Sequence, residues 1–335
     1  MIRKRNLDNS LIQWIMTVTG LGPGIGEIKW LAKAASTTSR FSTMLKDNGI
    51  DQGDLYATLA TTYADVLGYR NDVMLVMPGA YDEAATLDWT KSNLHLIGLG
   101  GPNSHSDYSE GNTVIYTDTT TVDYTIHLTG NHCQFINIGI NNAGNHATNY
   151  APMLVDGYGH YFKNVTFIGN MQANQLSASA CSSLGIYTNA HNCVWDNCQI
   201  GEDCWGNRSA ANSGQILFSG SQPNGGLFKN CRIKSMSNTA TCAAVATVSG
   251  VGASRIGRGW FWDTCLFNNY SSSSTEMNEV FHPDGNSAYW PQQLHNCSAF
   301  GYDEWSDNDN VVIRGTMPQA NDGGGIWIAL TDDEA

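Results

Sequence analysis

A six-residue phrase recurs six times in this 335-residue chain and limits what the chain can fold into. Its template is a large apolar residue, a polar residue, Asn, a small apolar residue, a variable residue and an apolar residue. The copies are Phe135-Ile-Asn-Ile-Gly-Ile140, Phe162-Lys-Asn-Val-Thr-Phe167, Trp195-Asp-Asn-Cys-Gln-Ile200, Phe228-Lys-Asn-Cys-Arg-Ile233, Trp262-Asp-Thr-Cys-Leu-Phe267 and Leu294-His-Asn-Cys-Ser-Ala299. Their starts are separated by 27, 33, 33, 34 and 32 residues. Such a period indicates a solenoid, in which each unit buries its apolar face against the next.

The phrase fits a strand with a bend at its third position. Side chains alternate along a strand, so position one points inward and position two outward. Positions four and six are also apolar, which requires a change of parity between positions two and four. Asn tolerates the left-handed backbone of such a bend. The pattern therefore predicts an all-β fold, a single-stranded right-handed parallel β-helix, with an amide ladder of Asn137, Asn164, Asn197, Asn230 and Asn296 at about 4.8 Å spacing, interrupted by Thr264.

Two further columns follow from the same alignment. Position four carries thiols that we expect to behave as small core hydrophobes, namely Cys198, Cys231, Cys265 and Cys297. Position two alternates in charge from coil to coil, through Lys163, Asp196, Lys229, Asp263 and His295. Outward neighbours of opposite charge on adjacent strands are expected to pair, which gives these residues a structural role.

The two ends of the chain lie outside the repeat. Residues 1–50 are predicted to form an extended arm that docks on another chain through the apolar anchors Leu11, Ile12, Trp14, Ile15 and Trp30. The apolar face of Asp54–Leu67 predicts an amphipathic helix, capped by Asp54 and stopped by Gly68, that covers the open end of the stack. The β-helix domain is expected over residues 51–330, followed by an acidic tail over residues 331–335.

Composition excludes several classes of function. The net charge of −13 disfavours nucleic acid and anionic membranes as partners. No run approaches the roughly 18 apolar residues of a membrane span. The histidines and cysteines show no two-plus-two zinc spacing, and neither a phosphate-binding loop nor a nucleophile elbow is present. We therefore expect no metal and no cofactor.

The helix, the strand from Asp72 to Pro78-Gly79, the Gly98-Leu-Gly turn and the Asn/Cys coils together resemble the pectin-lyase-like parallel β-helix superfamily over roughly residues 50–330. The order of the motifs looks, more narrowly, like that of β-helix virion proteins of tailed bacteriophages. This order is D-V-x-x-V-x-P-G-x-Y, then L-x-L-I-G-L-G, then the F-x-N coils. Those are capsid decorations, head fibres or tailspikes. The resemblance implies a homotrimer and attachment to a viral capsid or another virion protein.

Few residues are candidates for catalytic groups. Gly201-Glu202-Asp203 resembles a polygalacturonase motif, but the companion N-T-D and G-H-G motifs are missing. Asp303 and Glu304, followed by Asp307-Asn308-Asp309, form the densest acidic segment, without the Gly and terminal Glu of a calcium loop. Both segments also fit solvated surface turns. Exposed tryptophans could form a carbohydrate platform, and the candidates are Trp205, Trp260, Trp290 and Trp305.

These observations lead to three hypotheses. The first is a non-enzymatic structural protein of a bacteriophage virion, attached through its N-terminal arm, with a cell-surface glycan as a further candidate partner. The alternative is a polysaccharide-degrading enzyme, either a tailspike depolymerase or a pectinase-like glycosidase or lyase, with a secreted location in the second case. A surface that binds carbohydrate without turnover is a third hypothesis.

Overall fold

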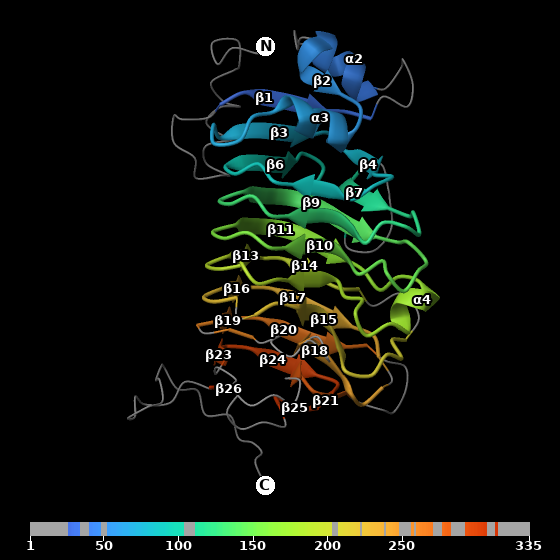
Figure 1. Cartoon of the computed structure of the whole chain (residues 1–335), viewed down its shortest axis with the longest axis vertical. Coiled ribbons are helices and arrows are strands. Elements are labelled where there is room, and N and C mark those ends of the chain that lie inside the picture. The colour runs from blue at the N-terminus through green and yellow to red at the C-terminus, as the bar shows by residue number, and fades with distance from the viewer. Residues whose placement is uncertain are drawn as a thin grey trace.

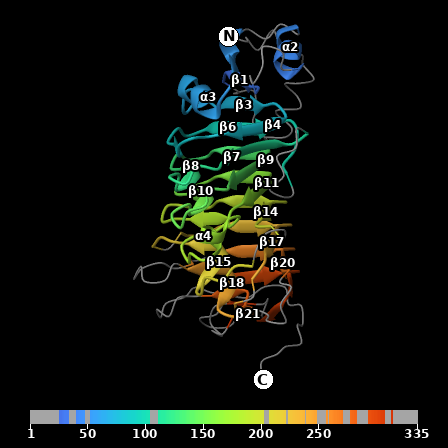
Figure 2. The ribbon, with the colours of Figure 1, turned by 90° about the vertical axis from the view of Figure 1, so that its right-hand side faces the viewer.

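The computed structural model of the chain describes residues 26–33, 40–47, 52–103, 111–202, 207–221, 223–237, 239–247, 256–257, 259–270, 277–282, 292–306 and 312–313. Strands stack along one long axis, and the colours follow the chain from one end of the stack to the other in both views (Figures 1 and 2). Every strand pairing in the described residues is parallel. The predicted right-handed parallel β-helix is confirmed.

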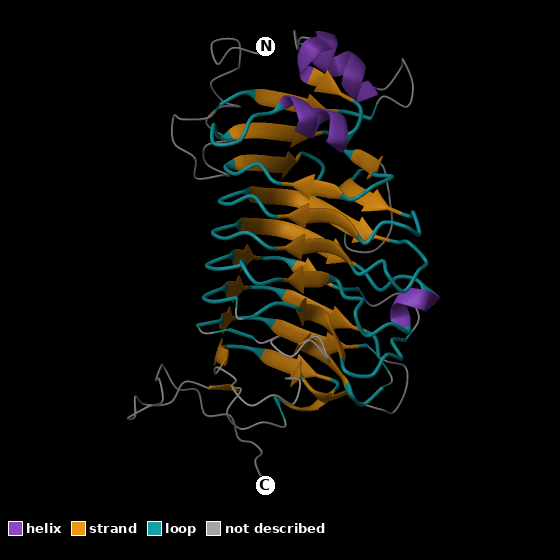
Figure 3. Ribbon diagram, in the orientation of Figure 1, coloured by secondary structure: helices purple, strands orange, loops and turns teal. Residues whose placement is uncertain are grey.

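The largest wall of the described stack is a 17-stranded sheet, here called sheet A, that carries the repeated phrases (Figure 3). Its strands are β1 (Ile28–Leu31), β2 (Leu55–Tyr56), β3 (Asp72–Val76), β4 (Gly79–Asp82), β6 (Leu94–Gly98), β7 (Thr113–Thr117), β9 (Gln134–Asn142), β11 (Tyr161–Ile168), β13 (Val194–Asp196), β14 (Gln199–Ile200), β16 (Leu227–Lys229), β17 (Arg232–Ser235), β19 (Phe261–Asp263), β20 (Leu266–Asn269), β23 (Gln292–His295), β24 (Ser298–Phe300) and β26 (Val312–Ile313).

The opposite wall is a 7-stranded sheet, here called sheet B. It contains β5 (Leu87–Trp89), β8 (Tyr124–Leu128), β10 (Ala151–Val155), β12 (Leu184–Ile186), β15 (Ser213–Phe218), β18 (Cys242–Thr247) and β22 (Phe281–His282). A separate pair is formed by β21 (Met277–Glu279) and β25 (Tyr302–Glu304). The helical elements are short: α2 (Arg40–Asp47), the 3-10 turn η2 (Gln52–Asp54), α3 (Leu59–Asp65) and α4 (Ala173–Leu176).

The phrases align in the register that the sequence predicts. Position one of each coil pairs with position one of the next, from Phe135 through to Leu294. Successive aromatic rings in this column stack inside the helix, with centroids 5.5 Å apart for Phe135–Phe162, 5.3 Å for Phe162–Trp195, 4.4 Å for Trp195–Phe228 and 4.2 Å for Phe228–Trp262. These rings are fully buried. The column therefore supplies a continuous apolar core, and it contributes stacking energy in addition to the burial.

The bend at position three is present in all six phrases. Its φ angle lies between 51° and 59° at Asn137, Asn164, Asn197, Asn230, Thr264 and Asn296. The amide ladder is shorter than the row of Asn residues. Asn164 Nδ2 donates to Asn137 Oδ1 at 2.6 Å, and Asn197 Nδ2 donates to Asn164 Oδ1 at 3.4 Å. At the fifth phrase, the hydroxyl of Thr264 donates instead to Asp263. This position has no side-chain amide that could bond to the Asn residues of the adjacent coils.

The cysteine column lies inside the stack. Cys198, Cys231 and Cys265 are buried, and Cys297 in the last coil is half-buried. Each thiol donates to a backbone carbonyl of the preceding coil, for example Cys231 Sγ to Trp195 O at 3.3 Å. The same contacts recur at Cys198, Cys265 and Cys297. The thiols act as small core groups with a satisfied weak donor.

The predicted helix over Asp54–Leu67 is only partly formed. Residues 55–56 are extended because β2 pairs with β1, so the helix α3 begins later, at Leu59, and is capped by the Thr58 hydroxyl rather than by Asp54. Two of its buried side chains, Leu59 and Tyr63, belong to the interior apolar cluster. The helix therefore packs against the first coils, as Figure 1 shows beside β3.

The boundary predicted at residue 50 is wrong, because sheet A begins before it. Strand β1 pairs along its whole length with β3, with Trp30 opposite Leu75. Trp30 is 5% exposed, so it is a residue of the folded stack and not an anchor on a free arm. The other four predicted anchors, Leu11, Ile12, Trp14 and Ile15, lie outside the described residues, as does the tail over residues 331–335.

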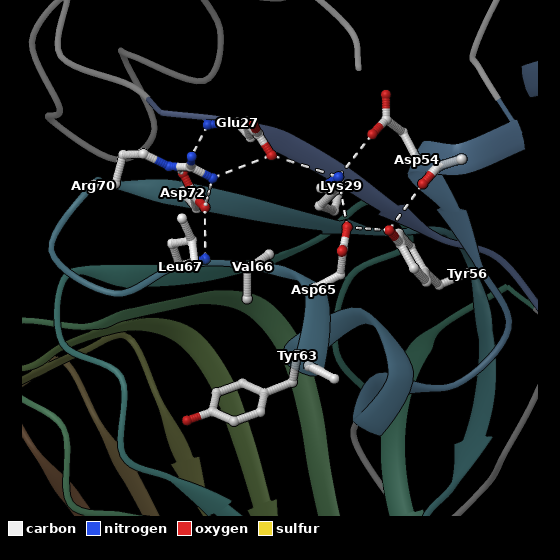
Figure 4. A network of polar contacts seen from close by, with 12 residues as sticks. Glu27, Lys29, Asp54, Tyr56, Tyr63, Asp65, Val66, Leu67, Arg70 and Asp72 are labelled. Atoms are coloured by element: carbon white, nitrogen blue, oxygen red, sulfur yellow. Dashed lines mark hydrogen bonds and ion pairs between the residues drawn. The ribbon is translucent and has the colours of Figure 1, made fainter.

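A polar network joins the segments at this end (Figure 4). Lys29 Nζ on β1 lies 2.8 Å from Asp54 Oδ1 and 2.7 Å from Asp65 Oδ2. Arg70 Nη2 lies 2.6 Å from Asp72 Oδ2 and 3.1 Å from Glu27 Oε2. Burial lowers the pKa of Lys29, but the hydrogen bonds to Asp54 and Asp65 outweigh it and hold the pKa above its ordinary value. The network connects β1 to η2, α3 and β3. We therefore assign it a structural role at this end of the stack.

Candidate functional site

The outer face of sheet A carries a strip of mostly polar side chains from β11 to β24. Position two of the phrases supplies one row, and position five supplies a second row beside it. Adjacent members are register partners on neighbouring strands. This "outer strip" consists of Lys163, Asp196, Lys229, Asp263, His295, Thr166, Gln199, Arg232, Leu266 and Ser298.

The carboxylates of the outer strip have local partners. The Tyr161 hydroxyl donates to Asp196 Oδ2 at 3.0 Å. Asp263 Oδ1 lies 2.8 Å from His295 Nδ1 and accepts from the Thr264 hydroxyl at 3.0 Å. The expected coil-to-coil pairing of opposite charges therefore occurs at one step, between Asp263 and His295. Neither Lys163 nor Lys229 forms an ion pair with an aspartate in the described stack. On an exposed face, the electrostatic energy of such a pair is small and is offset by the entropy lost when the long lysine side chain is fixed.

Three cations of the outer strip are left available. In the part of the chain that the structure describes, the side chains of Lys163, Lys229 and Arg232 form neither a hydrogen bond nor an ion pair. Lys229 and Arg232 are exposed, and Lys163 is half-buried. Lys163 and Lys229 are two coils apart, roughly 10 Å along the stack from the strand spacing of parallel sheets. This face of an acidic protein can therefore receive anionic groups that recur along an extended polymer.

Asp263 and His295 form the one arrangement on the outer strip that is suited to proton transfer. The hydrogen bond from His295, helped by Thr264, holds the pKa of Asp263 below its ordinary value. A carboxylate that accepts from Nδ1 fixes the tautomer of the neutral imidazole and leaves Nε2 as a proton acceptor. The two side chains are 24% and 32% exposed, so a large substrate can reach them.

The described carboxylate candidates lie in two separate parts of the stack. Glu202 follows β14 and is 6% exposed, directly after Gly201. Asp203 lies outside the described residues. Asp303 and Glu304 are exposed on β25. Strands β14 and β24 are three coils apart, or about 14 Å from the strand spacing, so the Glu202 segment and the Asp303–Glu304 segment belong to different coils.

Glu304 instead lies beside a group that the sequence did not single out. It is the register partner of Glu279 on β21, and the buried Glu279 carboxylate contacts His282 Nδ1. The Ser306 hydroxyl donates to Glu279 Oε2 at 3.2 Å and to Phe281 O at 2.9 Å. Because the serine contacts the carboxylate and not the imidazole, the geometry is not that of a nucleophile and its base. The turn from β21 to β22 creates this cluster, and no sequence motif marks it.

Of the four tryptophans proposed as a carbohydrate platform, the two that the structure describes pack against the core. Trp260 is fully buried and donates to Pro223 O at 2.8 Å, so its assignment to a platform is wrong: the ring fills the core. Trp305 packs against the interior cluster, with its ring centroid 5.9 Å from that of Phe267. Trp205 and Trp290 lie outside the described residues.

No group of three or more His, Cys, Asp or Glu side chains able to hold a metal ion occurs in the described part of the chain. Within the same residues, no helix has both the length and the apolarity to cross a membrane.

Comparison with known proteins defines the fold. No family model matches the sequence, and no curated protein matches it. The structure is similar to a pectin methylesterase in complex with a hexasaccharide (TM-score 0.51, 16% identity, 83% of this chain and 80% of that chain). It is also similar to pectin methylesterase PemA from Erwinia chrysanthemi (0.51, 15%, 85% and 81%) and to the enzyme from Aspergillus niger (0.50, 16%, 90% and 93%). The protein therefore has the pectin-lyase-like parallel β-helix fold.

Proposed function

We propose that this protein is a polysaccharide-active β-helix that binds an extended anionic polysaccharide along the outer strip. The observation that carries the proposal is the set of three cations, Lys163, Lys229 and Arg232, on one exposed face of a chain whose net charge is −13. The strip has the regular spacing of the strands beneath it, and a polymer with repeating acidic units can engage several coils at once. Each contact is individually weak in water, so affinity depends on their number.

The comparisons support this proposal through shape alone. These pectin methylesterases share the fold, and one of them is bound to a hexasaccharide. At about one residue in six identical, their chemistry does not transfer to this chain. The reactive group that we propose is its own pair, Asp263 and His295, with His295 Nε2 as a general base for a substrate held on the strip.

Binding is tested with polygalacturonate by affinity electrophoresis at two salt concentrations. Lys163→Gln, Lys229→Gln and Arg232→Gln should each weaken binding several-fold, and the triple variant should abolish it. Lys46→Gln removes the same charge from exposed α2, at the end of the stack, and should leave binding unchanged. Binding that survives in the triple variant would overturn the assignment of the outer strip, and neutral dextran serves as the uncharged comparison.

Turnover is tested separately with the same polymer and a panel of acidic glycans. Release of unsaturated or reducing ends that is lost in His295→Gln and strongly reduced in Asp263→Asn supports catalysis at this pair. Retained turnover in His295→Gln places the chemistry elsewhere. Binding without any turnover on the panel would leave a carbohydrate-binding role and remove the enzymatic part of the proposal.

The virion role remains a second candidate, and one observation favours it. All eight cysteines in the described residues are free thiols, seven of them buried, which suits folding in a reducing cytoplasm better than secretion. A bacteriophage structural or tailspike protein is assembled in such a compartment. Detection of the chain by mass spectrometry in purified particles supports this role, and its absence from them while present in the culture medium argues for a secreted protein. The expected homotrimer is tested by the mass of the purified protein in solution.

A further inference from the structure

The outer face of sheet A changes character at the N-terminal end. In the later coils it carries the polar outer strip, whereas in β1, β3, β6 and β9 it is mainly apolar, with His95 and Gln134 as polar members. Ile28, Trp30, Val73, Leu75, Ile97 and Ile136 form a cluster separate from the interior core, here called the N-terminal outer face. Their neighbours along each strand, such as Leu31, Met74 and Leu96, belong to the interior cluster, so alternation places these six side chains outside.

This face is covered, and a side chain of one described helix lies against it. Its six members are between 0% and 5% exposed. In the described part of the chain, Leu45 of α2 is the one side chain that a helix contributes to the cluster. A face four strands wide needs about 14 Å of cover across the strands, which a single leucine does not provide.

Three polar atoms on the same face are buried without a hydrogen bond. They are Trp30 Nε1, His95 Nδ1 and Gln134 Oε1. His95 is 1% exposed and is the register partner of Gln134 on β9, so these two atoms belong to neighbouring strands. Burial lowers the pKa of His95 to about 4, which leaves the imidazole neutral. Buried orphan groups of this kind are costly, and they call for an occupant with both donors and acceptors.

We propose that residues 1–25 of the same chain dock on the N-terminal outer face. This segment joins β1 directly, where Gly26 N donates to Asn71 O at 3.0 Å. It carries the closely spaced anchors Leu11, Ile12, Trp14 and Ile15. A peptide segment offers apolar side chains for the cluster, carbonyl oxygens for Trp30 and amide protons for His95 and Gln134.

The tether favours this occupant over a second copy of the chain. An extended segment of 25 residues reaches roughly 80 Å, far more than the width of the face. A tethered segment has a high effective concentration at its own face, of millimolar order for short flexible links. A separate copy has no such advantage at ordinary protein concentrations. The proposal goes beyond carbohydrate binding and is independent of the outer strip.

Photo-crosslinking of the full chain tests the docking directly. Benzoylphenylalanine placed at position 14 in place of Trp14 should crosslink within one molecule, to peptides that contain Leu75, Ile97 or Ile136. The same group placed at the exposed Phe300 should not reach these peptides. Crosslinks only between molecules indicate a second copy and overturn the proposal, as do crosslinks confined to other surfaces.

A second measurement does not require deletion of the segment. Ile12→Asp and Trp14→Asp should loosen the docked segment while β1 and the coils stay folded. Water then reaches His95, and its pKa, followed by NMR, should rise from about 4 toward its ordinary value of 6.5. Binding of polygalacturonate should be unchanged in these variants. An unaltered His95 pKa in both variants would show that something other than residues 1–25 covers the face.

Discussion

His295 Nδ1 lies 2.8 Å from Asp263 Oδ1, one coil apart on the outer face of sheet A. This hydrogen bond is the largest cause of the lowered pKa of Asp263. A carboxyl group with a lowered folded-state pKa stabilises the fold above its unfolded pKa, and that stability is lost as the pH falls through the folded pKa. The pair therefore links the proposed reactive group to acid stability.

We expect His295→Gln to raise the pKa of Asp263 toward its ordinary value. Because Asp263 is partly exposed, the accompanying loss of stability at neutral pH should be roughly 0.2–1 kcal/mol, as for other surface pairs. An NMR titration of the Asp263 carboxyl carbon measures the change. Lys46→Gln, remote from the pair, is the control, and an unchanged Asp263 pKa in His295→Gln would contradict the assignment.

Thr264 is the one phrase residue whose type conflicts with its backbone. Its φ is 57°, a conformation that is strained for a β-branched side chain and accessible to Asn. We expect Thr264→Asn to stabilise the fold by about 1 kcal/mol through relief of this strain, seen as a higher urea midpoint. Asn230→Thr, one coil away, is the matched reverse change and should lower the midpoint by a similar amount. A stabilising Asn230→Thr would show that the bend does not select the residue type.

The described cysteines that are buried should be unreactive in the folded protein. Burial raises the pKa of Cys133 to about 11 and holds that of Cys231 well above its ordinary value, and the thiolate is the reactive form. Among the described thiols, alkylation by iodoacetamide at neutral pH, mapped by mass spectrometry, should begin at the half-buried Cys297 and reach the other seven only after unfolding in urea. Modification of Cys231 before Cys297 in native protein would refute the buried column.

The period of the phrase was sufficient to predict the coils, because register and bend follow from local patterning. The positive φ at Asn137 and at the third position of the other phrases requires only a residue that tolerates the left-handed backbone, and Asn is such a residue. Strand β1 was missed since Ile28–Leu31 carries no phrase, and its place in the sheet is set by pairing with β3, some 45 residues later in the chain.

The site was less predictable than the fold. Asp263 and His295 were assigned to a charge column, and their proximity follows from that alignment, but the lack of partners for Lys163 and Lys229 depends on side-chain geometry. The cluster of Glu279, His282 and Ser306 is formed by a turn and a strand from the next coil. Contacts between segments that are distant in the sequence produce no local sequence pattern, so such a cluster cannot be predicted from the sequence.

Asp72 should govern the acid stability of the N-terminal end. Its buried carboxylate accepts from Glu27 N at 2.8 Å, Leu67 N at 2.9 Å and Arg70 Nε at 2.7 Å. Burial raises the pKa of Asp72, but the bonds from Arg70, Leu67 and Glu27 outweigh it, and the pKa is lowered. The stability that Asp72 contributes is therefore present above its unfolded pKa of about 3.9 and is lost as the pH falls through the lower folded value.

We expect Asp72→Asn to destabilise the fold by roughly 3 kcal/mol at neutral pH, the low end for a broken buried ion pair, since Arg70 is 36% exposed and recovers water. The urea midpoint measured from neutral pH down to acid should converge with that of the parent protein below the folded pKa. Asp88→Asn, at a side chain 72% exposed, is the matched control and should change the neutral midpoint little. Equal effects of the two substitutions would mean that Asp72 does not hold β1, α3 and β3 together, because only Asp72 loses the ion pair with Arg70 and one of its two acceptor oxygens on a buried carboxylate.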